Sequence, residues 1–324
     1  MQANTVGVHG SSGPLVSVVV TTRNEEANIA NCLESLAHQS WPNIETIVVD
    51  NASTDRTKEL ARRYTDKVAD KGPERSAQRN HGMIDMAMGE YVMYLDADMI
   101  CSPLLVEACV RHTERSRCMA LYVSEVVLGT SFWSRVRRFE RSFYDGTVID
   151  CARFMRRDVF QEVGGFDPAM SGPEDWDLDR KLRDRGRVDL LSAAASSLHM
   201  PSMPDTAAPQ QWAQADFVCQ RGVSWTGPET LIYHNEAEFN PIKYLSKKAY
   251  YVKSMDAYTS KWGADDPDVS RQLGLGYRFF GVFLERGKWR KLLAHPILGA
   301  GMYILRFMVG SVFLLRKLAR KRKA

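Results

Sequence analysis

Two β-branched apolar runs near the start of the chain each end abruptly in polar residues. Residues 15–22 read LVSVVVTT and residues 45–50 read ETIVVD. Continuous apolar runs of this length are typical of strands that are buried on both faces, as in a parallel sheet. Helical patterns follow each run, so strand alternates with helix and right-handed βαβ units are indicated. The sequence therefore predicts an α/β fold with a mostly parallel sheet flanked by helices.

The rest of the first hundred residues continues this alternation. Asn24 is placed to cap the first helix, with Ile29, Leu33 and Leu36 on its buried face. We expect the next elements in these ranges: a helix over 55–64, a short strand over 66–70, a helix within 74–88 and a strand over 90–99. Ligands bind at the carboxyl ends of such strands, so the polar stretches TTRNEE, DNASTD and DADM should converge on one crevice.

The last of these strands, EYVMYLDADM, ends in two carboxylates one residue apart, Asp96 and Asp98. Two like charges at the end of a buried strand need a positive partner. A divalent cation held by one or two carboxylates and by substrate phosphates would supply it. The alternative is that both residues only form the turn that ends the strand, which is common for Asp.

A second acidic stretch, PEDWDLD, opens a predicted helix that continues through Leu182. Pro173 suits the first helical turn, and Glu174 and Asp175 favour the positive N-terminus of a helix. That role in the helix is the structural explanation for both carboxylates. The functional explanation is that one of them is a general base at the edge of the crevice.

Taken together and in this order, VSVVVTTRNEEANI, IETIVVDNASTDRT, GEYVMYLDADM, GGFD and GPEDWDLDRKL resemble family 2 glycosyltransferases of the GT-A fold. The resemblance covers about residues 15–190, which makes it more specific than any single motif. It implies a Rossmann-like sheet, a nucleotide-diphosphate sugar donor, usually a UDP-sugar, and a divalent cation, Mn²⁺ or Mg²⁺. It also implies inversion of the anomeric centre.

The resemblance assigns roles to single residues. The nucleotide-binding positions that it implies are Thr21, Arg23, Glu25, Asp50, Asn51, Arg75 and Asp96. Asn51 is an amide where the family often has a carboxylate that reads the imide of uracil, and this weakens the expectation of a uracil base.

The metal and acceptor positions come from the same resemblance. Asp98 matches the carboxylate that binds the cation, with Asp96 and His234 as further ligands. His199 competes with His234 for that role, and either histidine could instead be an ordinary hydrogen-bonded one. Asp175 matches the catalytic base, and Glu174 and Trp176 then lie beside the acceptor.

Two segments have no assigned role in this pattern. The charges of RVRRFERSFY (135–144) could bind an acceptor phosphate, but a solvated helix face is the favoured interpretation. The Ala, Ser and Pro content of residues 192–230 indicates a loop or lid over the acceptor.

The charge is unevenly distributed along the chain. From Arg286 to the end there are eleven Lys and Arg and no Asp or Glu, and subtracting them from the net charge of +4 leaves −7 for residues 1–285. An apolar run, LLAHPILGAGMYILRFMVGSVFLL, lies within this basic end. We expect a monotopic or re-entrant membrane segment at about 288–324, held by apolar burial and by anionic lipids. The alternatives are a single span and an amphipathic helix packed on the catalytic domain or in a dimer.

The chain is therefore expected to have three parts: a leader (1–14), a catalytic domain (15–235) and a helical C-terminal extension (236–324). Within the catalytic domain, the nucleotide half covers about 15–100 and the acceptor half about 101–235. The composition, 44% hydrophobic and 25% charged, excludes a disordered or fibrous chain. Six cysteines without CxxC spacing argue against a zinc site or a disulfide framework, and the polar start has no signal-peptide pattern. We expect a cytoplasmic body at the inner face of the cell membrane and no nucleic-acid partner.

The expected function is an inverting glycosyltransferase that acts on a hydroxyl of a lipid-linked glycan. Three alternatives stay open at this point. The enzyme could transfer sugar directly to polyprenyl phosphate, as in dolichol-phosphate-sugar synthases. A sugar nucleotidyltransferase shares the α/β architecture, but its Gly-rich N-terminal signature is absent here. The chain could also be an inactive scaffold that binds nucleotide or glycan, although the joint presence of Asp96, Asp98 and Asp175 weighs against this.

Overall fold

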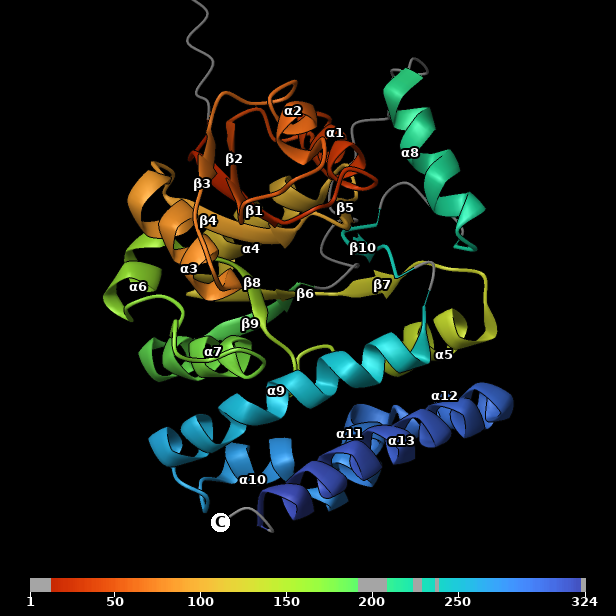
Figure 1. Ribbon diagram of the computed structural model, residues 1–324. Coiled ribbons are helices and arrows are strands. Elements are labelled where there is room, and N and C mark those ends of the chain that lie inside the picture. Colours follow the sequence, from red (N-terminus) through yellow and green to blue (C-terminus); the bar gives the residue numbers. More distant parts are fainter. Residues whose placement is uncertain (1–12, 192–208, 224–228, 237–238, 322–324) are drawn as a thin grey trace, which may run out of the picture.

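The structure, a computed structural model, describes residues 13–191, 209–223, 229–236 and 239–321. Its described part holds a mixed seven-stranded sheet with helices on both faces, a small three-stranded sheet and a separate layer of C-terminal helices (Figure 1). The large sheet has the order β3 (Val68–Asp70), β2 (Ile44–Asp50), β1 (Val16–Thr22), β4 (Tyr91–Asp96), β8 (Ala152–Arg156), β6 (Ala120–Val123) and β9 (Val188–Leu191). The small sheet has the order β5 (Met99–Cys101), β10 (Ile232–His234) and β7 (Glu125–Val127).

Most helices around the two sheets connect successive strands. They are α1 (Ile29–Ala37), α2 (Thr57–Ala61), α3 (Arg75–Asn80), the π-helix η1 (His81–Met86), α4 (Leu105–Ser116), α5 (Phe132–Arg141), α6 (Arg157–Glu162), α7 (Glu174–Arg185) and α8 (Pro209–Gln220). The C-terminal helices follow the last strand of the small sheet. They are α9 (Pro241–Trp262), α10 (Pro267–Leu273), η3 (Tyr277–Gly281), α11 (Val282–Leu284), η4 (Glu285–Gly287), α12 (Trp289–Ala294) and α13 (Pro296–Lys321).

The first four strands are parallel, as the apolar runs predict. Strand β1 pairs with β2 and β4 on its two sides, and all seven of its residues are buried. Val18 and Val20 pack toward α1 and α4, whereas Val19 packs on the opposite face with residues of η1, α6 and α7. The antiparallel strand β8 then joins β4 to β6, and β6 pairs in parallel with β9. The sheet is therefore mainly parallel, with one antiparallel strand in its middle.

The register of the strands brings their polar ends to one edge. Thr22 of β1 lies opposite Asp50 of β2, and Thr21 lies opposite Asp96 of β4. The predicted convergence of the three polar stretches is therefore confirmed. Asp98 does not extend β4, because it lies in the two-residue turn that leads to β5.

The prediction that Asn24 caps the first helix is wrong. Helix α1 begins later, after Asn28, and no side chain caps it. Asn24 has a positive φ of 53°, and its Oδ1 accepts a hydrogen bond from the backbone N–H of Thr54 at 2.8 Å. Asn24 therefore ties the loop after β1 to the loop after β2. Ile29, Leu33 and Leu36 are buried as expected.

Several predicted helices have different bounds. The helix expected over 55–64 shortens to α2, and the one expected within 74–88 divides into α3 and η1. Residues 209–220, expected as part of a loop or lid, form α8. The rest of that expectation falls partly on residues 192–208, and with them His199, outside the described residues.

The expectation that residues 135–144 form a solvated helix face is also wrong, whereas an acceptor-phosphate role for their charges stays a prediction. Helix α5 buries Arg137 and Glu140, which form an ion pair with each other. Arg306 of α13 binds Glu140 from the other side, with 3.2 Å between Nη2 and Oε1. The C-terminal helices thus cover the face of α5 that its sequence alone suggested to be in water.

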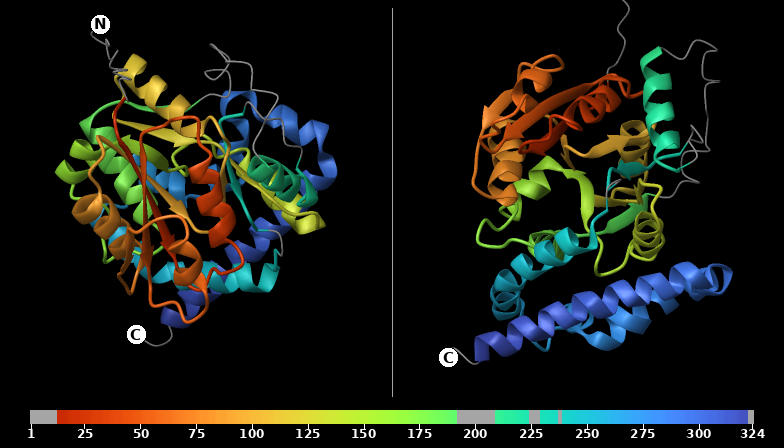
Figure 2. Two further views of the ribbon diagram at one scale, coloured as in Figure 1. Left: turned by 90° about the horizontal axis from the view of Figure 1, so that it is seen from above. Right: turned by 45° about the vertical axis from the view of Figure 1, so that its right-hand side comes forward.

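The C-terminal helices form the outermost layer of the molecule, with α9 between α13 and the large sheet (Figures 1 and 2). Helix α13 contacts both α5 and α9. The apolar contact joins Val136 and Phe143 to Phe283, Met302 and Leu305. Among the helices that the structure describes, none is both long and apolar enough to cross a bilayer. All six cysteines are free thiols.

Two glycines of α13 provide a test of this packing. A Cβ on Gly301 would lie 2.7 Å from Cγ2 of Val136 and 2.9 Å from Cζ of Phe132, whereas one on Gly299 would meet only Leu292, at 3.6 Å. Gly301→Ala should therefore lower the free energy of unfolding by about 1–3 kcal/mol through overpacking. Gly299→Ala should raise it by up to about 1 kcal/mol through helix propensity. Urea denaturation of both variants measures the difference, and an equal gain in both would show that α13 does not pack closely on α5.

Candidate active site

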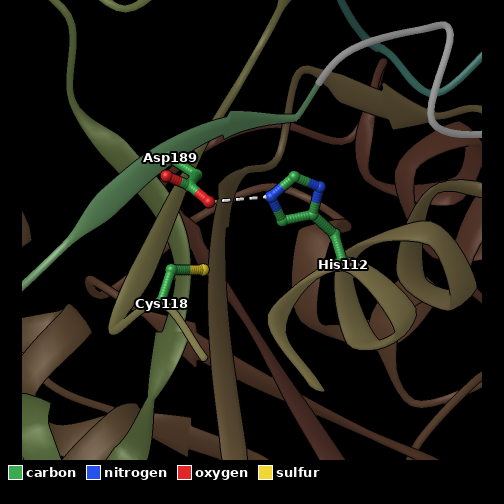
Figure 3. A group of neighbouring side chains, drawn as sticks. All are labelled: His112, Cys118 and Asp189. Carbon is green, nitrogen blue, oxygen red and sulfur yellow. Dashed lines mark hydrogen bonds and ion pairs between the residues drawn. The ribbon is translucent and has the colours of Figure 1, made fainter. Parts of the chain in front are cut away.

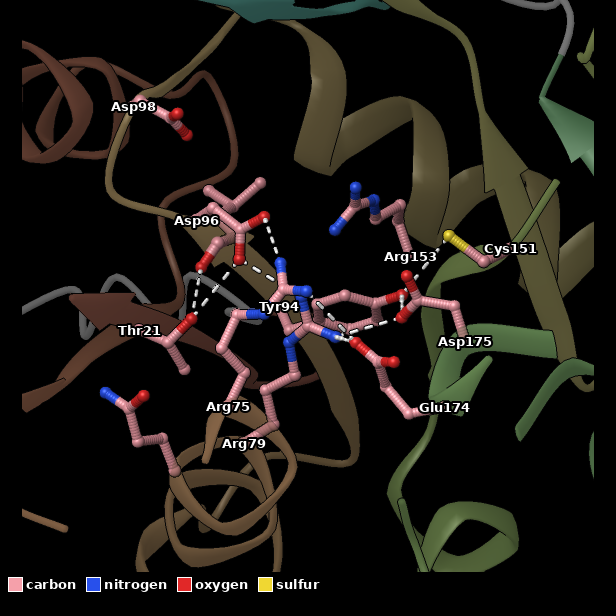
Figure 4. Close-up of polar contacts among 12 residues, drawn as sticks. Thr21, Arg75, Arg79, Tyr94, Asp96, Asp98, Cys151, Arg153, Glu174 and Asp175 are labelled. Atoms are coloured by element: carbon pink, nitrogen blue, oxygen red, sulfur yellow. Dashed lines mark hydrogen bonds and ion pairs between the residues drawn. The ribbon is translucent and has the colours of Figure 1, made fainter. Parts of the chain in front are cut away.

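The crevice at the carboxyl ends of β1 and β4 is built around Asp96 (Figure 4). The hydroxyl of Thr21 donates a hydrogen bond to Asp96 Oδ1 at 3.3 Å. Helix α3 supplies two arginines to the same carboxylate: Arg79 Nη2 lies 3.1 Å from Oδ1, and Arg75 Nη1 lies 3.9 Å from Oδ2. The negative charge of Asp96 is therefore compensated by guanidinium groups of the chain itself.

Arg79 joins the two halves of the site. Its side chain is only 1% exposed, and its Nη1 binds Asp175 Oδ1 of α7 at 2.9 Å while Nη2 binds Asp96 of β4. The guanidinium also lies 4.4 Å from the ring centroid of Tyr94 and 5.0 Å from that of Phe166. Planar, permanently charged arginine suits such a bridge, because its forked donors can satisfy two carboxylates at once.

The electrostatics of Asp96 follow from this arrangement. Burial alone would raise the pKa of its carboxyl, but the charges of Arg79, Arg75 and Arg153 outweigh that effect and hold the pKa well below its usual value. Arg153 of β8 lies 4.7 Å from the ring centroid of Tyr94. Asp96 is consequently a negative charge among cationic groups of the chain, and its predicted contacts with the nucleotide and with a metal ion stay predictions.

Asp98 has a different partner. Its Oδ2 lies 3.2 Å from Nε2 of His234, which β10 brings next to the turn after β4 through its pairing with β5. Among the described residues, Asp98 Oδ1 is buried without a hydrogen-bond partner. Such an atom is costly unless a ligand satisfies it. A carboxylate oxygen and an imidazole nitrogen side by side suit Mn²⁺, and the carboxylate alone suits Mg²⁺.

His234 is strongly influenced by the carboxylates around it. Burial lowers the pKa of the imidazole, but Asp98 and the more distant Glu236 and Glu125 outweigh it, which raises the pKa to about 9. The carboxylates of this region also affect Glu25, in the loop after β1. Burial and the charges of Asp98 and Asp96 raise the pKa of Glu25, although a hydrogen bond from Asn28 opposes the shift. The region around Asp98 is therefore the most acidic part of the crevice.

The residues at the end of β2 that are predicted to bind the nucleotide make hydrogen bonds within the protein. The side chain of Asp50 accepts hydrogen bonds from the backbone N–H and the hydroxyl of Ser53. Asn51 donates from Nδ2 to the carbonyl oxygen of Pro73 at 2.6 Å, which ties the two rims of the crevice together. Arg23 is exposed in the loop after β1. The structure brings these residues to the crevice edge, and their nucleotide contacts stay predictions.

The two carboxylates at the start of α7 differ in accessibility. The Glu174 side chain is 2% exposed and binds Arg75, with 3.3 Å between Oε1 and Nη2. Burial and the charge of Asp175 raise the pKa of Glu174. The Asp175 side chain is 27% exposed, and its Oδ1 accepts a hydrogen bond from the hydroxyl of Tyr94 at 3.3 Å. Asp175 is thus held in place yet open to a ligand, whereas Glu174 mainly fixes the helix start.

Trp176, predicted to lie beside the acceptor, contacts other residues of the protein. Its Nε1 donates to the carbonyl oxygen of Ile149 at 3.4 Å, and its ring lies 6.1 Å from that of Tyr258 in α9. Trp176 packs between the catalytic domain and the C-terminal helices, so a contact with the acceptor stays a prediction.

Arg79, Tyr94 and Arg153 belong to the site but were not identified from the sequence. For two of them, the spacing from a predicted site residue is a signal that the sequence offers. Arg79 follows Arg75 by four residues, so both lie on one face of a helix. Tyr94 precedes Asp96 by two residues, so both point to one side of a strand. Arg153 carries no comparable signal, because its partner Glu125 lies on another sheet, with 2.6 Å between Nη2 and Oε1.

A second group of possible metal ligands lies near the N-terminal ends of β6 and β9, away from the crevice (Figure 3). Side-chain atoms of His112, Cys118 and Asp189 lie within 4.8 Å of one another. Asp189 is already bound by His112 at 3.0 Å and by Arg187 at 2.5 Å. Burial raises the pKa of the Cys118 thiol, which disfavours the thiolate that a metal needs. We assign this group to the packing of α4 on the sheet.

Sequence comparison places the chain in a family. The model of "Glycosyl transferase family 2" matches residues 17–164. A relative named EpsE, from Bacillus subtilis (strain 168), is 33% identical over 193 residues, covering 53% of this chain and 67% of the relative. The chain belongs to glycosyltransferase family 2. A "PGL/p-HBAD biosynthesis glycosyltransferase" of Mycobacterium bovis is 24% identical over 180 residues, covering 52% of this chain and 69% of that protein.

Solved structures agree on the fold of this family 2 glycosyltransferase. The mannosyltransferase PcManGT from Pyrobaculum calidifontis, solved with GDP-Man and Mn²⁺, has a TM-score of 0.52 at 17% identity, covering 94% of this chain and 86% of that one. TarS of S. aureus has a TM-score of 0.50 at 16% identity, covering 92% of this chain. The match spans only 54% of the TarS chain. Both are similar in fold, which supports the predicted GT-A architecture.

The bridging role of Arg79 can be tested with a conservative change. Arg79→Lys keeps the charge but cannot reach Asp96 and Asp175 together, so the two halves of the glycosyltransferase site should shift. We expect the rate of sugar transfer to fall by about 10²-fold or more, as for other small misplacements of catalytic groups. The melting temperature should fall as well. Arg111→Lys is the control, because the Arg111 side chain is 63% exposed and, within the described structure, it forms an ion pair only with Glu107 of its own helix. Normal transfer by Arg79→Lys would contradict the bridging role.

Proposed function

We propose that this family 2 glycosyltransferase inverts the anomeric centre of a nucleotide-diphosphate sugar, with a UDP-sugar as the first candidate donor. The observation that carries the proposal is the accessible carboxylate of Asp175, held on the same guanidinium that holds Asp96. One open carboxylate is what a direct displacement needs, because a single base can remove the proton of the attacking hydroxyl.

In the proposed reaction the sugar is transferred in one direct displacement. The acceptor oxygen attacks the anomeric carbon, the bond from that carbon to the diphosphate breaks, and the acceptor proton passes to Asp175. The hydroxyl of Tyr94 and the guanidinium of Arg79 orient the base. Arg75, 35% exposed near Asp96, is placed to approach the departing diphosphate. Its planar fork suits phosphate oxygens.

The residues fit a divalent cation at Asp98. Asp98 and His234 would hold it, and the unpaired Oδ1 of Asp98 supplies a buried oxygen ligand. When bound, a cation of this kind neutralises charge on the phosphates of the donor and so stabilises the leaving group. PcManGT, which shares the fold, was solved with Mn²⁺.

Two residues at the end of β2 bear on which base the donor nucleotide carries. The carboxylate of Asp50 is engaged by Ser53 of its own loop, and Asn51 carries an amide that donates to Pro73 in the loop after β3. PcManGT was solved with GDP-Man. A calorimetric screen of UDP- and GDP-sugars separates the two donor classes, and we expect UDP-sugars to bind more tightly.

For the acceptor we propose a lipid-linked glycan, used at the inner face of the cell membrane. The basic, apolar C-terminal helices support this class of acceptor. Direct transfer to polyprenyl phosphate is the alternative, and the two differ in their need for a base. A phosphate oxygen is already anionic and attacks without losing a proton, whereas a sugar hydroxyl needs Asp175.

The cation site is tested by Asp98→Asn. This change keeps the size of the side chain but removes the charged ligand, so metal-dependent transfer should be lost and Mn²⁺ affinity should fall by about 10-fold or more. Calorimetry measures Mn²⁺ binding directly, and circular dichroism checks the fold. Asp85→Asn is the control, since Asp85 pairs with His81 at 2.9 Å on the exposed surface. Near-normal transfer by Asp98→Asn across a Mn²⁺ titration would remove this site from the mechanism.

The base is tested by Asp175→Asn, which keeps shape and polarity but cannot accept the proton. Transfer to a hydroxyl acceptor should fall by about 10² or more in kcat, with donor affinity nearly unchanged. Glu174→Gln is the matched neighbour and should be milder in kcat, because Glu174 is buried against Arg75.

Four results would contradict parts of this proposal. A larger loss in Glu174→Gln would move the base to the neighbouring carboxylate. A parallel loss of donor binding in Asp175→Asn would show that Asp175 acts in nucleotide binding. Normal transfer by Asp175→Asn would favour a polyprenyl phosphate acceptor, and no donor turnover by the unaltered chain with Mn²⁺ would favour the scaffold.

A further inference from the structure

Helix α13 exposes a regular row of apolar side chains on the side away from its buried face. The row follows a spacing of three and four residues from Ile297 through Ala300 and Ile304 to Phe307, and after the exposed Ser311 it continues at Leu314. Ile297 is 74% exposed and Phe307 is 64% exposed. Single exposed apolar residues are ordinary on protein surfaces, but a continuous row on one helix face marks a binding surface.

The neighbouring short helices extend the row into a surface. After α10 and through α12, the exposed large apolar residues are Leu275, Phe280, Leu284, Trp289 and Leu293. Ring contacts connect them to α13, because Phe279 lies 5.2 Å from Phe307 and Phe280 lies 6.5 Å from Tyr303. We call the ten exposed apolar residues of these two paragraphs the apolar face. The helices that carry it form the layer farthest from the large sheet (Figure 2).

Positive charge accompanies the apolar face. Arg286 and Arg290 are exposed, and the guanidinium of Arg290 lies 5.8 Å from the Trp289 ring centroid. The sequence after Glu285 contains no acidic residue, and residues 316–323 add six Lys and Arg. Apolar side chains, an interfacial tryptophan and basic residues without acidic ones are the combination that binds anionic membrane surfaces.

We propose that the apolar face docks on the surface of an anionic lipid bilayer, with its helices lying in the plane of the interface. This deepens the proposed function by naming the partner surface, and it rests on that function only for the class of acceptor. The docking surface includes η3, α11 and α12, and so begins earlier in the chain than the apolar run of the C-terminal segment.

A second copy of the chain is a less suitable occupant. A symmetric dimer through this face would bring the basic ends of two chains together, with no acidic residue beyond Glu285 to compensate them. Glu285 itself is engaged by Arg271 and by the hydroxyl of Tyr277. Charge therefore opposes self-association and favours a negatively charged lipid surface.

Hydrogen bonds and an ion pair fix the helices that carry the apolar face to the catalytic domain. Arg306 points inward from α13, and its Nη2 lies 2.5 Å from the hydroxyl of Tyr144 and 3.2 Å from Glu140 Oε1. Lys288 donates to the carbonyl oxygens of Phe143 and Asp145. Because these contacts fix the layer to α5 and to the loop after it, docking would hold the catalytic domain in one orientation above the lipid.

Vesicle sedimentation of the full chain tests the proposal. The chain should bind phosphatidylcholine vesicles that contain phosphatidylglycerol, bind pure phosphatidylcholine vesicles weakly, and lose affinity at high salt. The double variant Leu293→Ser/Ile297→Ser should bind the anionic vesicles about tenfold more weakly or worse, because it removes two large apolar contacts. Met88→Ser is the control, since Met88 is 72% exposed but lies outside the C-terminal helices. Circular dichroism checks that both variants fold.

Two results would overturn the proposal. One is that the chain does not bind anionic vesicles, or that the double variant binds them as tightly as Met88→Ser. The other is that light scattering shows a dimer of the full chain that the double variant dissociates, since a second copy would then cover the apolar face. Vesicle binding needs neither donor nor metal. A chain that binds vesicles without transferring sugar contradicts the proposed function alone, and one that transfers sugar without binding contradicts this inference alone.

Discussion

A single buried guanidinium determines how the two halves of this enzyme meet. Arg79 is held between Asp96, at the end of a central strand, and Asp175, at the start of α7. A buried charge is costly unless carboxylates and hydrogen bonds compensate it, so neither half can move away without leaving Arg79 uncompensated. The same contacts that lower this cost also fix the proposed base relative to the crevice, so stability and catalytic geometry depend on one interaction.

Similar buried ion pairs continue from the crevice toward the C-terminal layer. Glu125 lies 3.9 Å from His234, and Arg137 of α5 binds Glu236 at 3.3 Å and Glu140 on its own helix. Arg306 of α13 then binds Glu140. Apart from the Arg137–Glu140 pair within α5, each pair joins segments that are far apart in the sequence. The sheet, the small sheet and the C-terminal helices are thus oriented by charge pairs as well as by apolar contact, because an ion pair tolerates fewer geometries than an apolar surface does.

The sequence predicts the parts of the fold that local patterns control. The β-branched runs predict β1 and β2, and the alternation with helices predicts that Asp50 and Asp96 end at one edge. It fails where a partner comes from far along the chain. Arg137 looks like part of a solvated face because its partners Glu236 and Tyr244 lie about 100 residues later. Asn24 looks like a cap because its real partner, Thr54, belongs to another loop. The two carboxylate partners of Arg79 also lie on other elements, although its spacing of four residues from Arg75 is a local signal.

The structure also explains why two carboxylates follow β4. Alternation along an extended chain would send Asp96 and Asp98 to one side, where both would compete for the same positive group. The strand ends at Asp96 and a turn follows, so the two side chains meet different partners. Asp96 faces the arginines of α3, and Asp98 faces His234 with one oxygen left unpaired within the described structure. The two carboxylates therefore avoid mutual repulsion because they are separated: guanidinium groups compensate Asp96, and His234 lies beside Asp98, where we propose the cation site.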